Sequence, residues 1–356
     1  MARSSIVYIL FLFSGITALI YEVVWTRMLT LAFGHTVYSV SIVLAAFMTG
    51  LGLGSYFSGH AIDHSYGEKI YLDGNKLDKG LSEDLGTSSL LLVYGWIEIL
   101  LFFLCSIISL ILFKFSTVYS WLSFFIPDFW AIQNVVKCLL AFVLMSVPAF
   151  LMGATLPIIS KYYITCKTTL DSRLGVIYGI NTLGAAFGCL LAGFFLIANF
   201  GVLQTVLGAA LLNLFVGVSA IRIYQEVGKT EQGLYFPHFT MPTLAWGQKQ
   251  NIWMIVSFIC GFTALAYEVL WTRLLIFSTS STVYSFSMML GVFLIGITLG
   301  SFLAVAVFRS NLNLRTVLIF LQAGIGLYVI GSLYNMELLL SAPWNGYNLQ
   351  KPAFVF

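Results

Sequence analysis

Nine runs of mostly apolar residues recur along this chain, and they limit what it can fold into more than any other feature. A helix of about 20 apolar residues is long enough to cross the hydrocarbon layer of a membrane, because each residue adds about 1.5 Å. The runs therefore predict membrane-spanning helices. The expected spans are residues 5–27, 36–60, 88–113, 133–156, 174–198, 202–222, 251–272, 282–308 and 315–338.

The composition agrees with this interpretation. Of 356 residues, 60% are hydrophobic and only 9% are charged, whereas a soluble domain carries about 25% charged residues. So few charges cannot cover a surface that faces water, so the lipid bilayer is the expected partner of most of the surface. We therefore expect an all-α, polytopic membrane bundle of about nine transmembrane helices. The net charge of +3 is small and the basic residues are scattered, which gives no support for a nucleic-acid partner.

Neither the cysteines nor the histidines predict a metal site. The five cysteines are odd in number and form no CxxC motif, and four of them fall in apolar stretches. We interpret them as small core residues. The four histidines show no metal-ligand spacing. The sequence thus predicts no metal, no cofactor and no catalytic residue.

The distribution of basic residues predicts the orientation of the chain. With the N-terminus in the cytoplasm, 12 lysines and arginines fall on the inner side and 5 on the outer side. Cytoplasmic segments carry such an excess, so we expect a multi-pass protein of the cell inner (plasma) membrane. Residues 61–87 and 223–250 are then long inner loops. Residues 114–131, which are rich in Trp and Phe, are expected at the outer interface.

An internal repeat divides the chain. The segment SGITALIYEVVWTRML at 14–29 returns as CGFTALAYEVLWTRLL at 260–275, and TVYSVSIVLAAFMTGLGLGS at 36–55 returns at 282–301. The offset is 246 throughout, and 22 of the 41 positions from Gly15 to Ser55 are identical in the second copy. Six spans separate the copies, so both enter the membrane in the same direction. They are expected to be parallel repeats related by an axis along the membrane normal, as the halves of major facilitator transporters are.

This repeat predicts the domain organisation. We expect a first six-helix membrane unit, a cytoplasmic linker, a partial second unit of three helices and a short tail. Their predicted ranges are 1–222, 223–250, 251–340 and 341–356.

Each copy carries one glutamate and one arginine within its first helix. Glu22 and Glu268 lie 17 residues past the start of their spans, about 25 Å along and near the outer edge of the hydrocarbon layer. Arg27 and Arg273 follow five residues later, on a different face of the helix. We therefore expect cross-repeat pairs, Glu22 with Arg273 and Glu268 with Arg27. Such pairs clamp the two halves together or anchor helix ends, which is the favoured interpretation, or they form a solute or ion site.

Two more polar residues complete the candidate site. Glu98 lies about ten residues into the third span. It is the strongest solitary acidic candidate for a solute site, although a buried structural glutamate is the favoured interpretation. Asn181 lies in the fifth span. Hydroxyl groups near the outer start of the second helix of each copy could line a cavity or bond their own backbone. They belong to Tyr38, Ser39 and Ser41 and to Tyr284, Ser285 and Ser287.

The second helix of each copy carries a small-residue motif. Gly50 and Gly54 recur as Gly296 and Gly300. Glycines four residues apart let two helix backbones approach closely, so helix packing is the predicted role.

A loop signature is expected after the second helix. Gly59, Asp63 and Gly67 loosely resemble the glycine and aspartate pattern of a conserved loop in major facilitator transporters, although His64 and Glu68 stand where that pattern has arginines. A turn with a helix-capping aspartate is the alternative interpretation.

Several segments together resemble a known family. SGITALIYEVVWTRML, VLAAFMTGLGLGS, MGATLPIIS and YGINTLGAAFGCLLAGF are similar to the membrane part of the fused major facilitator/spermidine synthase proteins of bacteria and archaea. The resemblance covers most of residues 5–305. It implies helices followed by a cytoplasmic domain similar to polyamine aminopropyltransferases, which use decarboxylated S-adenosylmethionine and a polyamine.

The chain departs from this family after about residue 338. It has no strand followed by a glycine-rich nucleoside-binding turn and no Rossmann-like βαβ pattern, so no catalytic residue can be transferred to it. We expect a membrane domain that is not an enzyme by itself, and that anchors an aminopropyltransferase module or handles a polyamine-like solute. The alternatives are a stand-alone secondary transporter and an aminopropyltransferase whose catalytic domain is missing. Nine spans and a short second unit also lead us to expect an incomplete family member.

Overall fold

The computed structural model describes residues 2–34, 36–72, 82–124, 129–163, 170–228, 248–279, 281–308 and 313–341. Nearly all of them are helical, and no strand occurs among them, as the apolar runs predict. The helices are α1 (Ala2–Phe33), α2 (Thr36–Leu72), α3 (Ser82–Phe113), α4 (Phe115–Ser123), α5 (Trp130–Tyr163), α6 (Leu170–Leu191), a short π-helix η2 (Ala192–Leu196), α7 (Ile197–Gly228), α8 (Gln248–Thr279), α9 (Thr282–Phe308) and α10 (Leu314–Ser341).

Eight helical stretches in the described part of the chain are long and apolar enough to cross a membrane. One of them, Leu174–Glu226, has 53 residues and changes direction at Gly201, where φ is 80° and ψ is 174°. Only glycine adopts such a conformation at low cost. The kink separates the two spans expected at 174–198 and 202–222. By length and composition, these are the helices of a multi-pass membrane protein.

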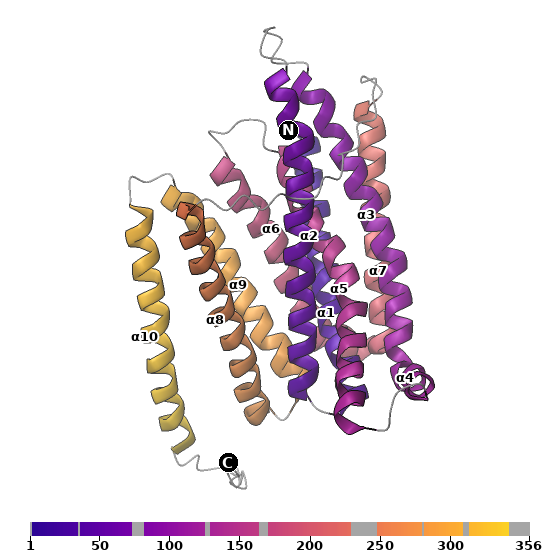
Figure 1. Cartoon of the computed structure of the whole chain (residues 1–356), viewed down its shortest axis with the longest axis vertical. Helices are drawn as coiled ribbons and strands as arrows, with labels where there is room; N and C mark the ends of the chain where they lie inside the picture. Colours follow the sequence, from indigo (N-terminus) through magenta and orange to yellow (C-terminus); the bar gives the residue numbers. More distant parts are fainter. Residues whose placement is uncertain are drawn as a thin grey trace. The chain divides into compact units, whose positions relative to one another are not determined.

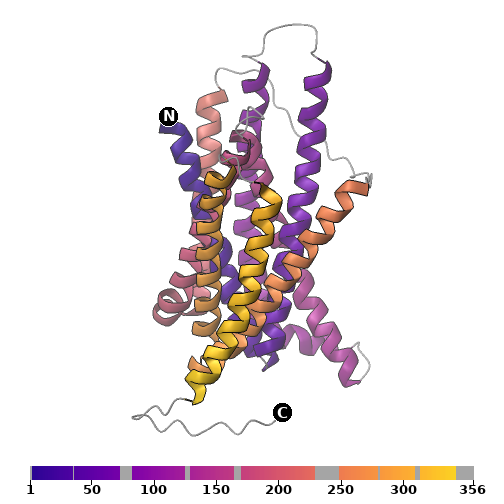
Figure 2. The ribbon, with the colours of Figure 1, turned by 90° about the vertical axis from the view of Figure 1, so that its left-hand side faces the viewer.

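Within the unit that holds α1 to α9, successive long helices run in alternating directions, so α1, α3 and α8 share one direction (Figures 1 and 2). Helix α1 packs against α2, α3, α6 and α7, while α2 packs along α5 and α3 along α7. The parallel pair α1 and α3 keeps one register over three hydrogen bonds, each of which joins residues 84 apart. These bonds run from Tyr94 to Leu10, from Ser14 to Glu98 and from Trp25 to Ser109.

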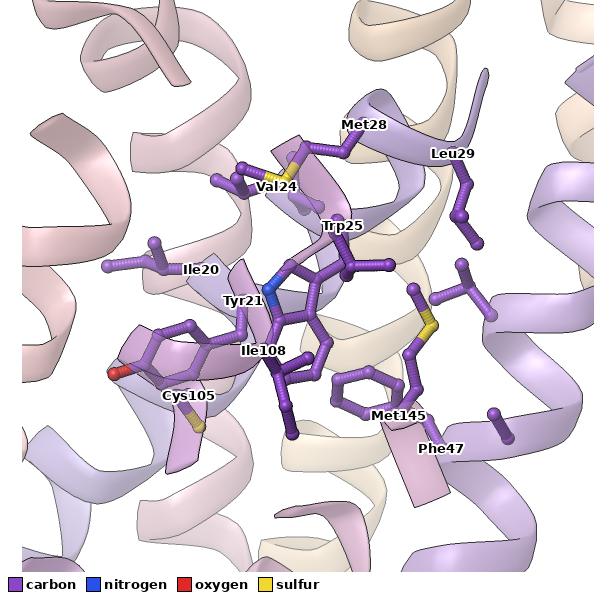
Figure 3. Close-up of a cluster of buried hydrophobic side chains, with 14 of the residues drawn as sticks. Ile20, Tyr21, Val24, Trp25, Met28, Leu29, Phe47, Cys105, Ile108 and Met145 are labelled. Carbon is purple, nitrogen blue, oxygen red and sulfur yellow. The ribbon is translucent and has the colours of Figure 1, made fainter. Parts of the chain in front are cut away.

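The apolar core gathers around Trp25 of α1 (Figure 3). The indole ring is completely buried and lies between the rings of Tyr21 and Phe47, with ring centroids 5.5 and 5.7 Å away. Its Nε1 donates a hydrogen bond of 2.7 Å to Ser109 Oγ. Side chains of α1, α2, α3 and α5 meet here, so the core of the first copy lies where these four helices converge.

The second copy packs on the first through α9. Antiparallel contacts run along α6, from Gly179 beside the ring of Phe302 to Phe194, which stacks on Tyr284 with centroids 5.3 Å apart. The chain divides into two compact units. The first extends to Val305, and the second begins at Ala306 and contains α10. The rotation that relates the two copies remains a prediction.

The expected inner loop after the second helix is wrong in part. Helix α2 continues to Leu72, so Gly59, Asp63 and Gly67 lie on a helix and not in a turn. The segment contains no proline, and two isolated glycines do not stop a helix. Helices α7 and α8 likewise extend into the expected linker 223–250, of which residues 229–247 lie outside the described residues, as does the tail from 342.

Helix α4 occupies part of the aromatic segment 114–131. Figure 1 shows it nearly end-on, where α3 ends and α5 begins. Phe115 is buried in the core, whereas Trp121 and Phe124 are exposed. An interfacial position remains a prediction for this helix.

Candidate functional site: a buried carboxylate pair

Helix α8 hides its acidic residue and exposes its apolar ones. Glu268 is completely buried, and Thr272, one turn later, is 2% exposed; these are the two buried side chains among the described residues of α8. Large apolar side chains such as Phe258 and Phe262 are 73% and 66% exposed. This is the arrangement expected of a helix in lipid, where ionisable groups face the interior of the bundle.

Glu22 of α1 and Glu268 of α8 are both buried, and the carboxylate of Glu268 acts electrostatically on Glu22. Each lies 11 residues before the end of its helix, about 16 Å of helix. Both helices continue beyond the expected spans, and the depth of the two glutamates in the membrane remains a prediction.

The expected cross-repeat ion pairs are not formed. Both oxygens of Glu268 and the Oε1 atom of Glu22 have no hydrogen-bond partner among the described residues. Arg273 is exposed and Arg27 is half-buried, which fits the different helix faces that the five-residue spacing predicts. The two repeats therefore bring like charges together, where sequence reasoning expected opposite charges.

Hydroxyl and thiol groups complete the surroundings of the pair. The thiol of Cys189, on α6, interacts electrostatically with both carboxylates and donates a hydrogen bond of 3.4 Å to the Ser287 carbonyl oxygen. Ser287 Oγ, which lies against Gly193, and Thr272 Oγ1 are buried without a partner. The equivalent hydroxyl of Thr26 instead donates to the Glu22 carbonyl oxygen at 2.7 Å.

The amino-acid sequence predicts only some of the groups around the two glutamates. Cys189 was interpreted as a small core residue, and nothing in its spacing marks it as a neighbour of the glutamates. Ser287 was one of the hydroxyls that could line a cavity, and its unpartnered oxygen is consistent with that interpretation. Ser285 instead bonds its own backbone, donating to the Ser281 carbonyl oxygen at 2.6 Å.

Glu98 lies in a separate polar cluster on another face of α1. It is completely buried, and its Oε1 accepts a hydrogen bond of 2.5 Å from Ser14 Oγ. Tyr94, one turn earlier on α3, also hydrogen-bonds the carboxyl group. Tyr21 extends the cluster toward α7, where Asn213 Nδ2 lies 3.5 Å from the Tyr21 hydroxyl.

Asn181 has a packing role. A Cβ atom on Gly15 would collide with the Asn181 carbonyl oxygen, and it would lie 2.9 Å from its side-chain oxygen. The absence of a side chain at Gly15 therefore lets α1 and α6 touch at Asn181. Nearby, Gly184 and Gly188 of α6 meet the α1 backbone at Leu12 and Ile16 in the same way.

The two copies of the small-residue motif differ in their contacts. Gly50 and Gly54 of α2 lie against α5, where a Cβ atom on Gly54 would collide with the Phe150 carbonyl oxygen. Cβ atoms on Gly296 and Gly300 of α9 would meet nothing within 4 Å among the described residues. The predicted packing role therefore applies to the first copy in the described part of the chain.

The paired carboxylates and their hydroxyl neighbours form a site with the chemistry to attract a cation. The electrostatic neighbour that acts on Glu22 is another acid, Glu268, and not a base. Groups of three or more His, Cys, Asp and Glu suited to a metal are absent from the described residues. Comparison with protein-family models, curated proteins and solved structures finds no match to the chain.

Proposed function

We propose that this chain is the membrane domain of a carrier for polyamine-like solutes, and that the Glu22–Glu268 pair binds a protonated amino group of the solute. The observation that carries the proposal is that two buried carboxylates, one from each copy of the repeat, are close enough for one to act electrostatically on the other, and that three of their oxygens have no partner among the described residues. The resemblance to the membrane part of fused spermidine synthase proteins supports a polyamine as the solute.

Electrostatics supports a cation at this position. A carboxylate inside the apolar part of a bundle is costly unless it is paired or hydrated, and a second carboxylate beside it adds repulsion. An alkylammonium group offers one positive charge and up to three N–H donors. It would satisfy the unpartnered oxygens of Glu22 and Glu268, with the hydroxyl groups of Thr272 and Ser287 as further acceptors.

A role as a passive anchor explains this arrangement less well. An anchor needs an apolar surface and close helix packing, and both can be built from the neutral side chains that make up most of the chain. Unpaired acids would only lower its stability. Ionisable groups that face the interior of a membrane bundle are characteristic of transport paths and ion sites.

The test is uptake and binding of radiolabelled putrescine and spermidine by the purified protein in liposomes. We expect uptake by the unaltered protein and at least a tenfold loss in both Glu22→Gln and Glu268→Gln. Glu226→Gln, which alters an exposed acid at the end of α7, is the matched control and should retain full uptake. Absence of uptake and binding in the unaltered protein, or full uptake by Glu268→Gln, would contradict the proposal.

A further inference from the structure

Glu98 has the surroundings of a proton-binding site, distinct from the amine site. Its Oε1 accepts the Ser14 hydroxyl at 2.5 Å, whereas its Oε2 is buried and has no partner among the described residues. One oxygen of the carboxyl group is therefore held in place while the other is free to gain a hydrogen atom.

The polar groups around Glu98 are weak acids or neutral. Tyr21 of α1 and Cys105 of α3 interact with the carboxylate and with each other, and Tyr94 hydrogen-bonds it. From α7 comes Asn213, which is fully buried and whose Oδ1 has no partner among the described residues. This second unpartnered buried oxygen is an acceptor within the same cluster.

The charged residues of the neighbouring helices lie elsewhere. On α5, Lys137 lies 4.4 Å from the centroid of the Tyr119 ring, and Lys161 is in the last turn of the helix. On α7, Arg222 and Glu226 follow Asn213 by 9 and 13 residues. Helix α4 carries no charged residue, and on α1 the described charged side chains are those of Glu22 and Arg27. The groups that act on the Glu98 carboxyl are Ser14 and Tyr94, so none of these cations neutralises it.

We propose that Glu98 takes up a proton on Oε2 and releases it during the transport cycle, so that the first copy of the repeat carries a coupling proton while the carboxylate pair carries the amine. The step adds one proton to the carboxylate and breaks no other bond. The hydrogen bond from Ser14 positions Oε1. Because Tyr21 of this cluster and Glu22 of the pair are consecutive residues on α1, a movement of α1 changes both sites together.

The role in coupling rests on the proposed transport function, but proton binding itself can be tested without any solute. The C=O stretching band of protonated carboxyl groups can be followed by infrared spectroscopy during a pH titration of the protein in liposomes. We expect a component of this band that titrates in the unaltered protein and in Glu226→Gln, and that is absent in Glu98→Gln. Ser14→Ala should keep the component and shift its frequency, because the hydrogen bond to Oε1 is lost. Identical titrations of the unaltered protein and Glu98→Gln would overturn the proposal.

Coupling is tested by putrescine uptake with and without a pH gradient. We expect Glu98→Gln to lose at least tenfold of the gradient-driven uptake while it keeps exchange of labelled for unlabelled putrescine at equal pH. Glu268→Gln should lose both. If Glu98→Gln retains gradient-driven uptake, the coupling role is wrong and the amine site still stands. If the unaltered protein neither takes up nor binds putrescine or spermidine, the transport function is wrong, and the infrared titration still decides whether Glu98 binds a proton.

Discussion

Glu268 lies where a stability-optimised bundle would have a neutral residue. It acts electrostatically on Glu22, and neither of its oxygens has a hydrogen-bond partner among the described residues. We predict that Glu268→Gln stabilises the ligand-free protein by about 1–3 kcal/mol, because the change removes a buried acid without a counter-charge and keeps the side-chain volume. The measurement is the thermal unfolding midpoint in detergent, without polyamine.

The control is Arg273→Gln, which neutralises an exposed charge five residues later on the same helix and should leave the midpoint nearly unchanged. In the double variant with Glu22→Gln, the gains should fall short of the sum, since the repulsion is removed only once. A fall in the midpoint of Glu268→Gln would show that the carboxylate is satisfied in a way that the structure does not include.

Sequence reasoning identified the glutamates of this site but not their partners. Glu22 recurs as Glu268 at the offset of 246. Chance similarity between two apolar segments does not explain a repeated glutamate, so both residues could be identified as significant. Helical periodicity also separates each glutamate from its own arginine. It does not say which faces of two different helices meet, and attraction between opposite charges suggested the wrong pairs. Cys189 could not be predicted, because its place beside the pair depends on how α6 packs against α1 and α9.

At the scale of helices, the two small-residue motifs allow a matched experiment. We predict that Gly54→Leu destabilises the protein by about 1–3 kcal/mol, because its side chain would be forced into the backbone of α5 at Phe150. Gly300→Leu, the same change at the equivalent position of the repeat, meets open space in the described structure and should be close to neutral. Thermal unfolding of both variants in detergent is the measurement.

An equal loss of stability in the two variants would contradict this difference. It would mean that the face of α9 around Gly300 is covered in the assembled protein as the face of α2 is covered by α5. Ala substitutions at Gly50 and Gly296 repeat the comparison with a smaller side chain, and the loss should again be confined to the first copy.

The bend at Gly201 offers a second matched pair. Its φ of 80° lies in the left-handed region, so we predict that Gly201→Ala costs about 1–3 kcal/mol of stability. Gly208, two turns further along α7, is helical, and a Cβ atom there meets nothing within 4 Å. Gly208→Ala should therefore stabilise the protein by about 0.5–1 kcal/mol. A neutral Gly201→Ala would show that the bend can relax into a continuous helix.

Hydropathy predicted where the helices are better than where they end. Apolar runs fixed the spans, but α2 continues to Leu72 through residues too polar to count as membrane-spanning. Water-exposed helix extensions are not marked by an apolar pattern, and their limits depend on capping and on contacts. The break between the two spans of Leu174–Glu226 was predictable, since apolar runs on both sides flank a glycine at position 201.

At the scale of the whole chain, the two copies play different roles. In the first compact unit, α1 of the first copy is surrounded by four helices, whereas ten of the 24 side chains described on α8 are exposed and two are buried. The half-buried Val269 packs against the core, but the two fully buried side chains described on α8, Glu268 and Thr272, are polar. If α8 were held mainly by apolar packing, its buried side chains would be apolar and its exposed ones polar. Burial of polar side chains is expected of a helix whose position depends on a ligand bound near the two glutamates. This burial therefore favours a site at the junction of the copies.

The alternation of the spans predicts on which side of the membrane each exposed helix end lies. Asp63 near the end of α2 and Glu226 near the end of α7 are exposed, as is Trp121 on α4. One span, α3, separates Asp63 from Trp121, so they lie on opposite sides. Four spans separate Asp63 from Glu226, so they lie on the same side. The excess of basic residues, 12 against 5, predicts that Asp63 and Glu226 face the cytoplasm.

We therefore expect single cysteines, introduced after replacing the five native ones by alanine, to react with a membrane-impermeant maleimide in intact cells at position 121. At positions 63 and 226, labelling should require permeabilised cells. The inverse pattern would reverse the orientation and keep the helix count, whereas equal labelling at 63 and 121 would mean that α3 does not cross.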